Sequence, residues 1–228
     1  MKRRPARVER RLRKDELGTR RQLLEAAGQV FAERGFDRAT GKEICQKAGA
    51  NIAAVNYYFG GMTGLYAAVL HEAHNRLVTP DALSAAVAGK SDAKAKLRAA
   101  LQLFVRAITG TRVDVWVLRV LGREIVAPSP ALKGYEIKVR KPKVLIMKGI
   151  VGELLGLPED HPAVARCCIS VMAPCIMLLI GDRKTLKGIF PALAIGPDDA
   201  DSLAEHLTQF ALAGLDVVSK SIKRQRVV

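Results

Sequence analysis

Apolar residues recur along this chain at intervals of three and four positions, which is the spacing of an amphipathic α-helix. No stretch alternates apolar and polar residues between hairpin-type turns, so the pattern gives no indication of strands. Glycine and proline interrupt the helical pattern and set the helix limits. Beyond the first ninety residues, the predicted helices cover 92–109, 112–126, 130–156, 161–180 and 199–219. The pattern therefore predicts an all-α fold with nine or ten helices.

Signals for helix ends are most regular in the N-terminal quarter of the chain. Thr19 with Gln22, and Thr40 with Glu43, have the spacing of a capping box, in which two side chains satisfy free N–H groups at a helix start. Asn51 is a favourable N-cap for a third, short helix. Short helices joined by a tight glycine-containing turn are typical of a helix-turn-helix unit. We therefore expect such a unit here, followed by a longer helix.

The net positive charge of the chain indicates which class of partner it binds. The chain carries 37 Lys and Arg residues against 22 Asp and Glu, a net charge of +15, and such a field favours nucleic acid. Ten of the basic residues and three of the acidic ones fall within residues 1–21. Because four of these cations would share one helical face and repel, we expect residues 1–18 to be a flexible basic arm that contacts DNA phosphates. A solubilising tail would explain the same charges.

Cysteine spacing and the length of the apolar runs bear on cofactors and compartment. The four cysteines include no CxxC pair and no zinc-ligand spacing, so we expect free thiols in a reducing cytoplasm, with no metal and no cofactor. The N-terminus lacks the apolar segment of a signal peptide. The apolar run from Cys167 to Ile180 spans about 14 residues, whereas a membrane-spanning helix needs roughly 20. We therefore expect a buried helix there, and no membrane partner.

The segment from Thr19 to Leu70 resembles the DNA-binding domain of TetR-family transcriptional regulators. The residues that carry this resemblance are Leu23, Leu24, Ala26, Ala27, Phe31, Ala32, Gly35, Phe36, Thr40, Ile44, Ala48, Gly49, Val55, Asn56, Tyr57, Tyr58, Phe59, Leu65 and Tyr66. Gly61–Met62 replaces the family's usual Ser-Lys, which removes an expected phosphate contact, and Asn56 replaces a common Tyr, which implies a different base preference. The resemblance implies an all-α homodimer that represses transcription and leaves DNA when a small ligand binds.

A second group of residues resembles the CecR-type group within this family. It comprises Asn51–Ala54, Asn56–Phe59, Arg119, Arg123–Glu124 and Pro128–Leu132. The family architecture implies three parts: the basic arm at 1–18, the helix-turn-helix domain at 19–61, and a helical effector-binding and dimerisation domain at 62–228.

The resemblance also places the outer face of the third helix in the major groove of DNA. Ile52 and Ala53 suit a thymine methyl group, Asn56 suits adenine, and Lys42 suits guanine. We expect Tyr58 to donate to a phosphate oxygen and Tyr57 to be shared between packing and phosphate contact. The predicted DNA-contacting residues are Thr40, Lys42, Ile52, Ala53, Asn56, Tyr57, Tyr58, Arg20 and Arg21. A small exposed helix without base contacts would explain the alanines equally well.

The expected effector site lies among the helices of the second domain. The segment from Val113 to Val126 is apolar on most sides, which predicts a central helix, and an arginine inside it needs a partner. Arg119 therefore faces either an anionic effector or an internal acid such as Glu124. An excess of Lys and Arg between Lys133 and Lys148 favours an anionic or polar aromatic ligand, although a solvated basic face explains it too. The predicted effector-binding residues are Phe104, Trp116, Arg119, Arg123 and Met147; for Trp116 a place in the core is the simpler reading.

Two apolar stripes predict the surface between subunits. They lie at helical spacing on the segment 168–179 and on the last helix, where they would form a four-helix interface. The predicted interface residues are Cys168, Met172, Cys175, Leu203, Leu207 and Phe210. The cysteines would also allow a soft-metal site or a thiol sensor, but helix packing is the simpler explanation.

These observations predict a ligand-responsive repressor that binds a palindromic DNA operator as a homodimer. The alternative is a small-molecule-binding helical protein whose basic surface is incidental. The sequence has no nucleophile elbow, P-loop or GxGxxG motif, so we do not expect an enzyme.

Overall fold

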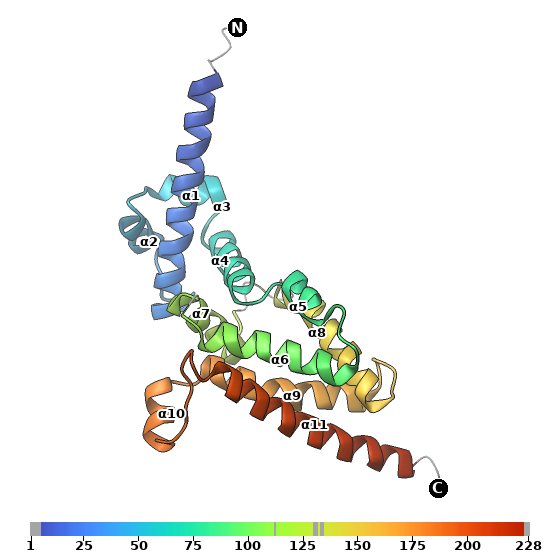
Figure 1. Cartoon of the computed structure of the whole chain (residues 1–228). Coiled ribbons are helices and arrows are strands. Elements are labelled where there is room, and N and C mark those ends of the chain that lie inside the picture. Colours follow the sequence, from blue (N-terminus) through green and yellow to red (C-terminus); the bar gives the residue numbers. More distant parts are fainter. Residues whose placement is uncertain (1–5, 112, 130–131, 133–134, 226–228) are drawn as a thin grey trace. The chain divides into compact units, whose positions relative to one another are not determined.

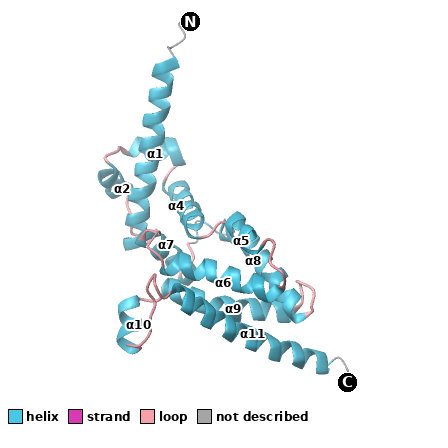
Figure 2. Cartoon of the chain, in the orientation of Figure 1, coloured by secondary structure: helices cyan, strands magenta, loops and turns pink. Residues whose placement is uncertain are grey.

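The computed structural model describes residues 6–111, 113–129, 132 and 135–225, with side chains from residue 17 onward except at 135–138. Helices dominate these ranges and no strand occurs in them, which confirms the all-α prediction (Figures 1 and 2). The helices are α1 (Ala6–Arg34), α2 (Gly41–Ala48), α3 (Ile52–Phe59), α4 (Met62–Leu77), α5 (Pro80–Val87), α6 (Ala93–Thr109), α7 (Val115–Val126), α8 (Tyr135–Leu155), α9 (Pro162–Ile180), α10 (Arg183–Ile189) and α11 (Ala200–Gln225). The short helices α5 and α10 occupy segments that the apolar pattern left unassigned.

The chain divides into two compact units. Unit 1 contains the residues up to Ala73 together with Arg119–Tyr135, and unit 2 contains His74–Leu118 and the residues from Glu136 onward. Most of α4 and the second half of α7 therefore belong to unit 1. This division differs from the expected boundary after residue 61, because α4 buries its apolar residues within unit 1.

Helix α1 begins much earlier than the capping pattern predicted. It runs without interruption from Ala6 to Arg34, so Thr19 lies inside the helix and the predicted helix start there is wrong. Residues 6–17 are mostly Ala, Arg, Lys, Glu and Leu, which are good helix formers. The expected repulsion between like charges, only about 0.2–0.5 kcal/mol per pair, does not prevent the helix. The first five residues of the predicted arm lie outside the described residues.

The core of unit 1 joins α1 to α2, α3 and α4. Leu23, Phe31, Ile44, Val55 and Leu65 are all buried in it. Phe31 also meets the ring of Tyr66 edge to face, with centroids 4.8 Å apart. Both short helices, α2 through Ile44 and α3 through Val55, thus contribute buried apolar side chains to the core that they share with α1.

The second half of α7 completes unit 1 with a pair of charged residues. The Arg123 guanidinium donates from Nε to the carbonyl of Ala32 and from Nη2 to that of Glu33, both at 2.9 Å. These carbonyls belong to the last turn of α1, where a cation also complements the helix dipole. The adjacent Glu124 is buried and accepts hydrogen bonds from the Tyr66 hydroxyl and the Ser129 backbone N–H.

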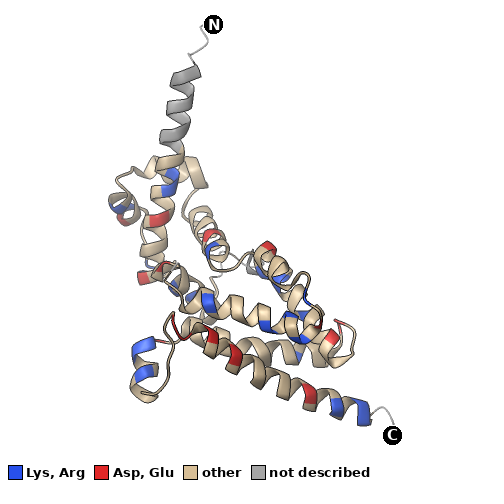
Figure 3. Ribbon diagram, in the orientation of Figure 1, with Lys and Arg blue, Asp and Glu red and all other residues tan. Residues whose placement is uncertain are grey.

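Unit 2 is built around α6, which packs against α5, α9 and α11. Its buried cluster includes Leu101 and Phe104 of α6, Met147 of α8 and Val171 of α9. Acidic residues follow α11 and basic residues follow α6 where the two helices run side by side (Figure 3). Four of them pair across this seam, Arg98 with Glu205 and Arg106 with Asp201.

Helix α9 matches the predicted helix at 161–180 in its limits but is more exposed than predicted. It spans 19 residues, and by length and composition alone it is long and apolar enough to cross a membrane. Only 33% of its most apolar window is buried inside the protein. Ile169, Ile176, Met177 and Ile180 are exposed along one side of it. The expectation that α9 is fully buried is therefore wrong.

Candidate nucleic-acid interface

Local capping fixes the limits of α2. Thr40 has an extended backbone, and its Oγ1 accepts a hydrogen bond from the Glu43 N–H at 3.2 Å. Gly49 ends the helix with φ +63°, a conformation that favours glycine. The Glu43 carboxylate does not reach back to complete the capping box, because Oε1 pairs with Arg34 Nε at 2.7 Å. This ion pair instead joins the start of α2 to the end of α1.

Helix α3 is fixed at both ends in a similar way. Asn51 Oδ1 accepts from the Ala54 N–H at 3.0 Å, as its place in the sequence predicts. The helix ends at Gly60, with φ +69°. The turn into α4 also requires Gly64, since a Cβ atom there would lie 1.8 Å from the Phe59 carbonyl oxygen. With Val55 buried, these constraints hold the opposite side of α3 toward solvent.

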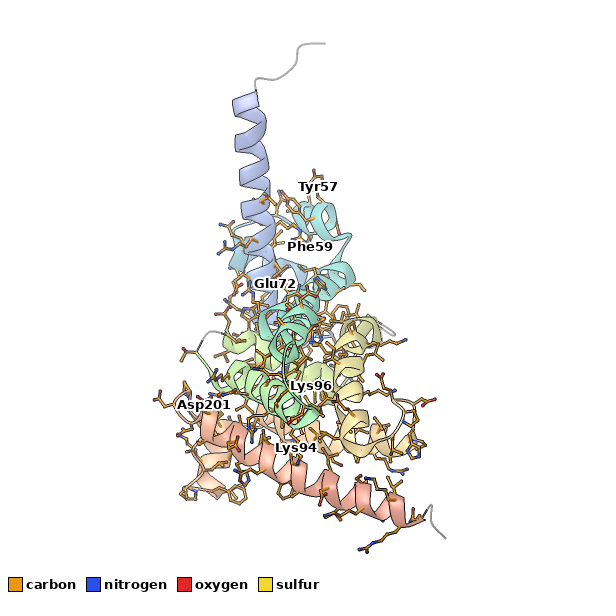
Figure 4. The ribbon with its side chains drawn as sticks, turned by 45° about the vertical axis from the view of Figure 1, so that its right-hand side comes forward. Tyr57, Phe59, Glu72, Lys94, Lys96 and Asp201 are labelled. Atoms are coloured by element: carbon orange, nitrogen blue, oxygen red, sulfur yellow. The ribbon has the colours of Figure 1, made fainter. Side chains whose placement is uncertain are left out.

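The exposed side of α3 carries the side chains expected to read DNA bases. Ile52 is 53% exposed and Tyr57 is 74% exposed; Ala53 and Asn56 are exposed as well. Figure 4 shows Tyr57 projecting outward from α3. Lys42, on the first turn of α2, is also exposed. The structure thus leaves most of the predicted contact residues accessible, and their contact with DNA stays a prediction.

Two aromatic contacts at the end of α3 were not visible in the sequence. The Arg20 guanidinium lies 5.1 Å from the centre of the Phe59 ring, a cation–π geometry. The Tyr57 and Tyr58 rings meet edge to face, with centroids 4.9 Å apart, and Tyr58 is half-buried. Arg20 therefore binds α3 to α1 in addition to any role on DNA, whereas Arg21 is simply exposed. Only the fold brings Arg20 and Phe59 together.

The predicted effector residues are divided between the two units. Phe104 and Met147 lie in the buried core of unit 2. Trp116 is buried too, and the Arg76 guanidinium lies 5.1 Å from the centre of its indole ring. Arg119 is exposed, so the expectation that it needs a buried partner is wrong. Arg123 belongs to unit 1, where it caps α1, and we no longer assign it to an effector site.

The predicted subunit stripe on α9 faces the core instead of solvent. Cys175 is fully buried. Cys168, Met172, Leu203 and Leu207 are half-buried and pack against the same core. Of the six predicted interface residues only Phe210 is strongly exposed, at 75%. Ile169, Ile176 and Met177, which are exposed, lie one or two positions along the helix from the predicted residues.

Cysteine chemistry plays no visible part in unit 2. Cys167, Cys168 and Cys175 are free thiols. Burial raises the pKa of Cys168 to about 11 and that of Cys175 to about 12, so both are protonated at neutral pH and poorly reactive. Across the described part of the chain, no three or more His, Cys, Asp or Glu side chains are grouped where they could hold a metal ion.

Known protein families match both parts of the chain. The family described as bacterial regulatory proteins, tetR family, matches residues 23–69, which include α2 and α3. The C-terminal domain of the HTH-type transcriptional dual regulator CecR matches residues 93–215, more than half of the chain. The chain belongs to the TetR family, in its CecR-type group. The surface formed by α2 and α3 is accordingly the helix-turn-helix of a TetR-family regulator.

Two curated relatives of this CecR-type regulator share parts of its sequence. The HTH-type transcriptional activator FasR of Mycolicibacterium smegmatis is 36% identical over 94 residues, which are 41% of each chain. The HTH-type transcriptional dual regulator CecR of Shigella flexneri is 49% identical over 49 residues, which are 22% of each chain. The chain spans less than half the length of either relative in these matches.

Solved structures of transcriptional regulators share the fold at low identity. The fatty acid degradation regulator FadR from Bacillus halodurans superposes with a TM-score of 0.65 at 16% identity, covering 86% of this chain and 96% of FadR. FadR from Bacillus subtilis, solved with stearoyl-CoA, gives 0.64 at 16% identity, covering 85% and 97%. A TetR-like regulator from Rhodococcus sp. RHA1 gives 0.62 at 22% identity, covering 86% and 96%. At these identities the similarity concerns the fold.

Proposed function

We propose that this DNA-binding transcriptional regulator is a repressor that binds a palindromic operator as a homodimer and is released by a small-molecule effector. The observation that supports it most directly is the face of α3, held between two caps, on which Ile52, Ala53 and Asn56 are exposed. A helix presented in this way fits the major groove, whose base edges differ for all four base pairs. Its relatives include an activator and a dual regulator, so the direction of control is part of the proposal.

On DNA, each side chain of this face has a distinct role. Asn56 pairs with adenine through its carboxamide, Ile52 and Ala53 contact thymine methyl groups, and Lys42 reaches guanine. Tyr57 and Tyr58 donate to phosphate oxygens, which position the protein without reading sequence. Thr40, Arg20, Arg21 and the basic residues of the N-terminal arm add phosphate contacts. Together these contacts bind one half-site.

The second subunit binds across α9 and α11. We replace the subunit surface expected from the sequence with the apolar residues that the fold leaves exposed on these helices. They are Ile169, Ile176, Met177, Ile180, Phe210 and Val217. Monomeric proteins rarely expose so many large apolar groups together, and α9 and α11 pack side by side. Two copies of this pair form a four-helix interface, which sets the two α3 helices about 34–36 Å apart on DNA.

The effector binds in unit 2 and is anionic. Helix α8 carries Arg140, Lys141, Lys143 and Lys148 next to the apolar core formed with α6. An amphipathic ligand with an apolar chain and an acidic head would suit both features. FadR of Bacillus subtilis, which shares this fold, was solved with such a ligand, stearoyl-CoA. A protein with this function works in the cytoplasm, where the chromosome and free thiols are found.

The proposal is tested by selecting duplexes from a random pool with the purified protein and measuring their binding by fluorescence anisotropy at two salt concentrations. We expect selected duplexes with two related half-sites, bound specifically in excess competitor DNA. Reporter transcription from a promoter that carries the selected site should fall when the protein is present. Stearoyl-CoA should weaken binding. Equal affinity for all duplexes would favour the alternative, a small-molecule-binding protein with an incidental basic surface, and increased transcription would make it an activator.

A further inference from the structure

The first residue of α2 leaves open a space that a side chain of α3 occupies. A Cβ atom built on Gly41 would lie only 2.5 Å from Ile52 Cδ1, closer than such atoms approach one another in proteins. The same Cβ atom would lie 3.9 Å from Ile52 Cγ1, an ordinary contact. Ile52 therefore folds its terminal methyl group over the bare Cα of Gly41, and only that methyl group conflicts with a larger residue.

Met62 borders the same space from the start of α4. Its sulfur would lie 3.5 Å from the Cβ atom built on Gly41. The first residues of α2, α3 and α4 thus meet at one point, since Gly41, Ile52 and Met62 open these three helices. The Ile52 side chain rests on this junction and still keeps about half of its surface accessible.

The position of the Ile52 methyl group depends on this support. Ile is branched at Cβ, so its χ1 angle is stiff in a helix and Cγ1 is fixed by the backbone of α3. Only rotation about χ2 moves Cδ1, and the space over Gly41 decides which χ2 position is available. A residue larger than glycine at position 41 would turn Cδ1 away without moving α3.

We propose that Gly41 determines base preference without touching DNA, because it fixes where the Ile52 δ-methyl group meets the methyl group of a thymine. The inference rests on the proposed function, in which α3 enters the major groove. It extends that function by assigning one base contact to a residue on another helix. Contact between the two methyl groups removes apolar surface from water and distinguishes thymine from bases that lack the methyl group.

The test uses the duplex selected by the wild-type protein, with each thymine replaced singly by deoxyuridine, which lacks only the methyl group. We expect one position per half-site at which wild-type affinity falls about fourfold, corresponding to about 0.8 kcal/mol for one buried methyl group. Ile52→Val removes only Cδ1 and should abolish this difference. Gly41→Ala should reduce or abolish it as well, while binding to unrelated DNA stays unchanged.

The decisive comparison is the double variant. Because Val lacks the conflicting methyl group, Gly41→Ala should have no further effect in the Ile52→Val background, and this double variant has room for the new Cβ atom. Gly188→Ala, in α10 with open space around it, is the matched control and should leave all affinities unchanged. Alanine favours helix more than glycine does, so the thermal midpoint of Gly41→Ala should stay level or rise.

Two results would overturn the inference while leaving the proposed function intact. One is a Gly41→Ala protein with the wild-type ratio of thymine to deoxyuridine affinity. The other is an effect of Gly41→Ala that is equally large in the Ile52→Val background. If the wild-type protein selects no duplex at all, the proposed function itself is wrong and the inference with it.

Discussion

The Tyr66 hydroxyl donates a hydrogen bond of 2.7 Å to the buried carboxylate of Glu124, and this bond joins α4 to α7 within unit 1. The other oxygen of the carboxylate accepts the Ser129 N–H at 2.8 Å. Glu124 is only 2% exposed, so water cannot replace a partner that is lost. A buried carboxylate is tolerated here because donors on two separate segments converge on it.

Tyr66→Phe should therefore destabilise the protein. A hydrogen bond to a charged group is worth about 1.5–3 kcal/mol, and its loss leaves one carboxylate oxygen without the hydroxyl. Urea unfolding should show a free energy of unfolding lower by about that amount. Tyr57→Phe is the matched control, because this tyrosine is mostly exposed. Equal stability of the two variants would mean that the hydrogen bond from Tyr66 to Glu124 does not stabilise the fold.

Replacement by methionine should lower the free energy of unfolding at one arginine of α7 and leave it nearly unchanged at another. Arg123→Met removes both hydrogen bonds to the carbonyls of Ala32 and Glu33 and should cost about 1–3 kcal/mol of unfolding free energy. Arg119→Met changes an exposed residue and should stay within about 0.5 kcal/mol of wild type. Thermal or urea unfolding of both variants tests this. If Arg119→Met instead lowers the free energy of unfolding as much as Arg123→Met does, Arg119 has a structural partner, as the sequence suggested.

Asn56→Ala should relax base preference at one position of each half-site. The loss of a bidentate contact should cost about 1–3 kcal/mol against the preferred base, while binding to unrelated DNA barely changes. Anisotropy titrations of the selected duplex and its single-base variants measure both quantities. Asn75→Ala, an exposed asparagine of α4, serves as the control. An unchanged preference at every position would remove Asn56 from the reading face.

Phe210→Asp should weaken subunit association without unfolding the protein. Phe210 is 75% exposed in the single chain, so its replacement leaves the core intact. A charge buried in the four-helix interface should raise the dimer dissociation constant by at least about tenfold, equivalent to about 1.4 kcal/mol. Analytical ultracentrifugation measures this, with Ser221→Asp as a control on the same helix. A wild-type protein that is monomeric at micromolar concentration would contradict the proposed interface outright.

The seam between α6 and α11 should make stability depend on pH in the acid range. Hydrogen bonds from Arg106, at 2.7 and 2.9 Å, and from Gln102 hold the pKa of Asp201 below its ordinary value. A carboxyl group with a lowered pKa in the folded state stabilises the fold above its unfolded pKa and loses this contribution as pH falls through the folded value.

Asp201→Asn should therefore make the stability of the protein depend less on pH below about pH 6. Urea midpoints measured from pH 6 to pH 3 should fall less steeply for this variant than for wild type. Because both partners are exposed, the difference should shrink at about 1 M salt, where charges are screened within roughly 3 Å. Identical slopes in low salt would show that Asp201 adds nothing to the pH dependence.

Features that depend on neighbouring residues could be predicted from the sequence. The caps Thr40 and Asn51 act over three or four positions, so their signal is local, although the same kind of signal at Thr19 proved wrong because α1 continues through it. The side of α3 that faces solvent was expected from the family resemblance, and the burial of Val55 agrees with it.

Features that depend on distant residues could not be predicted. Arg123 finds its partners about ninety positions away, at the end of α1, and nothing in the sequence around it distinguishes a helix cap from a ligand contact. The interface stripe on α9 failed for a different reason. Nearly every position of this helix is apolar, so periodicity did not separate Cys168 and Met172, which face the core, from Ile169 and Ile176, which do not.

The uninterrupted length of α1 has a mechanical consequence. A helix of 29 residues is about 43 Å long at 1.5 Å per residue. Its second half is held in unit 1 by the buried Leu23 and Phe31, by the Arg20–Phe59 contact and by Arg123, so only the part before about residue 19 acts as a lever. A bend of about 10° at that point would carry the first turn, about 20 Å away, through about 3.5 Å, roughly the rise of one base pair. In the proposed complex, a small bend of α1 near Arg20 would therefore change which DNA phosphates its basic first turns reach.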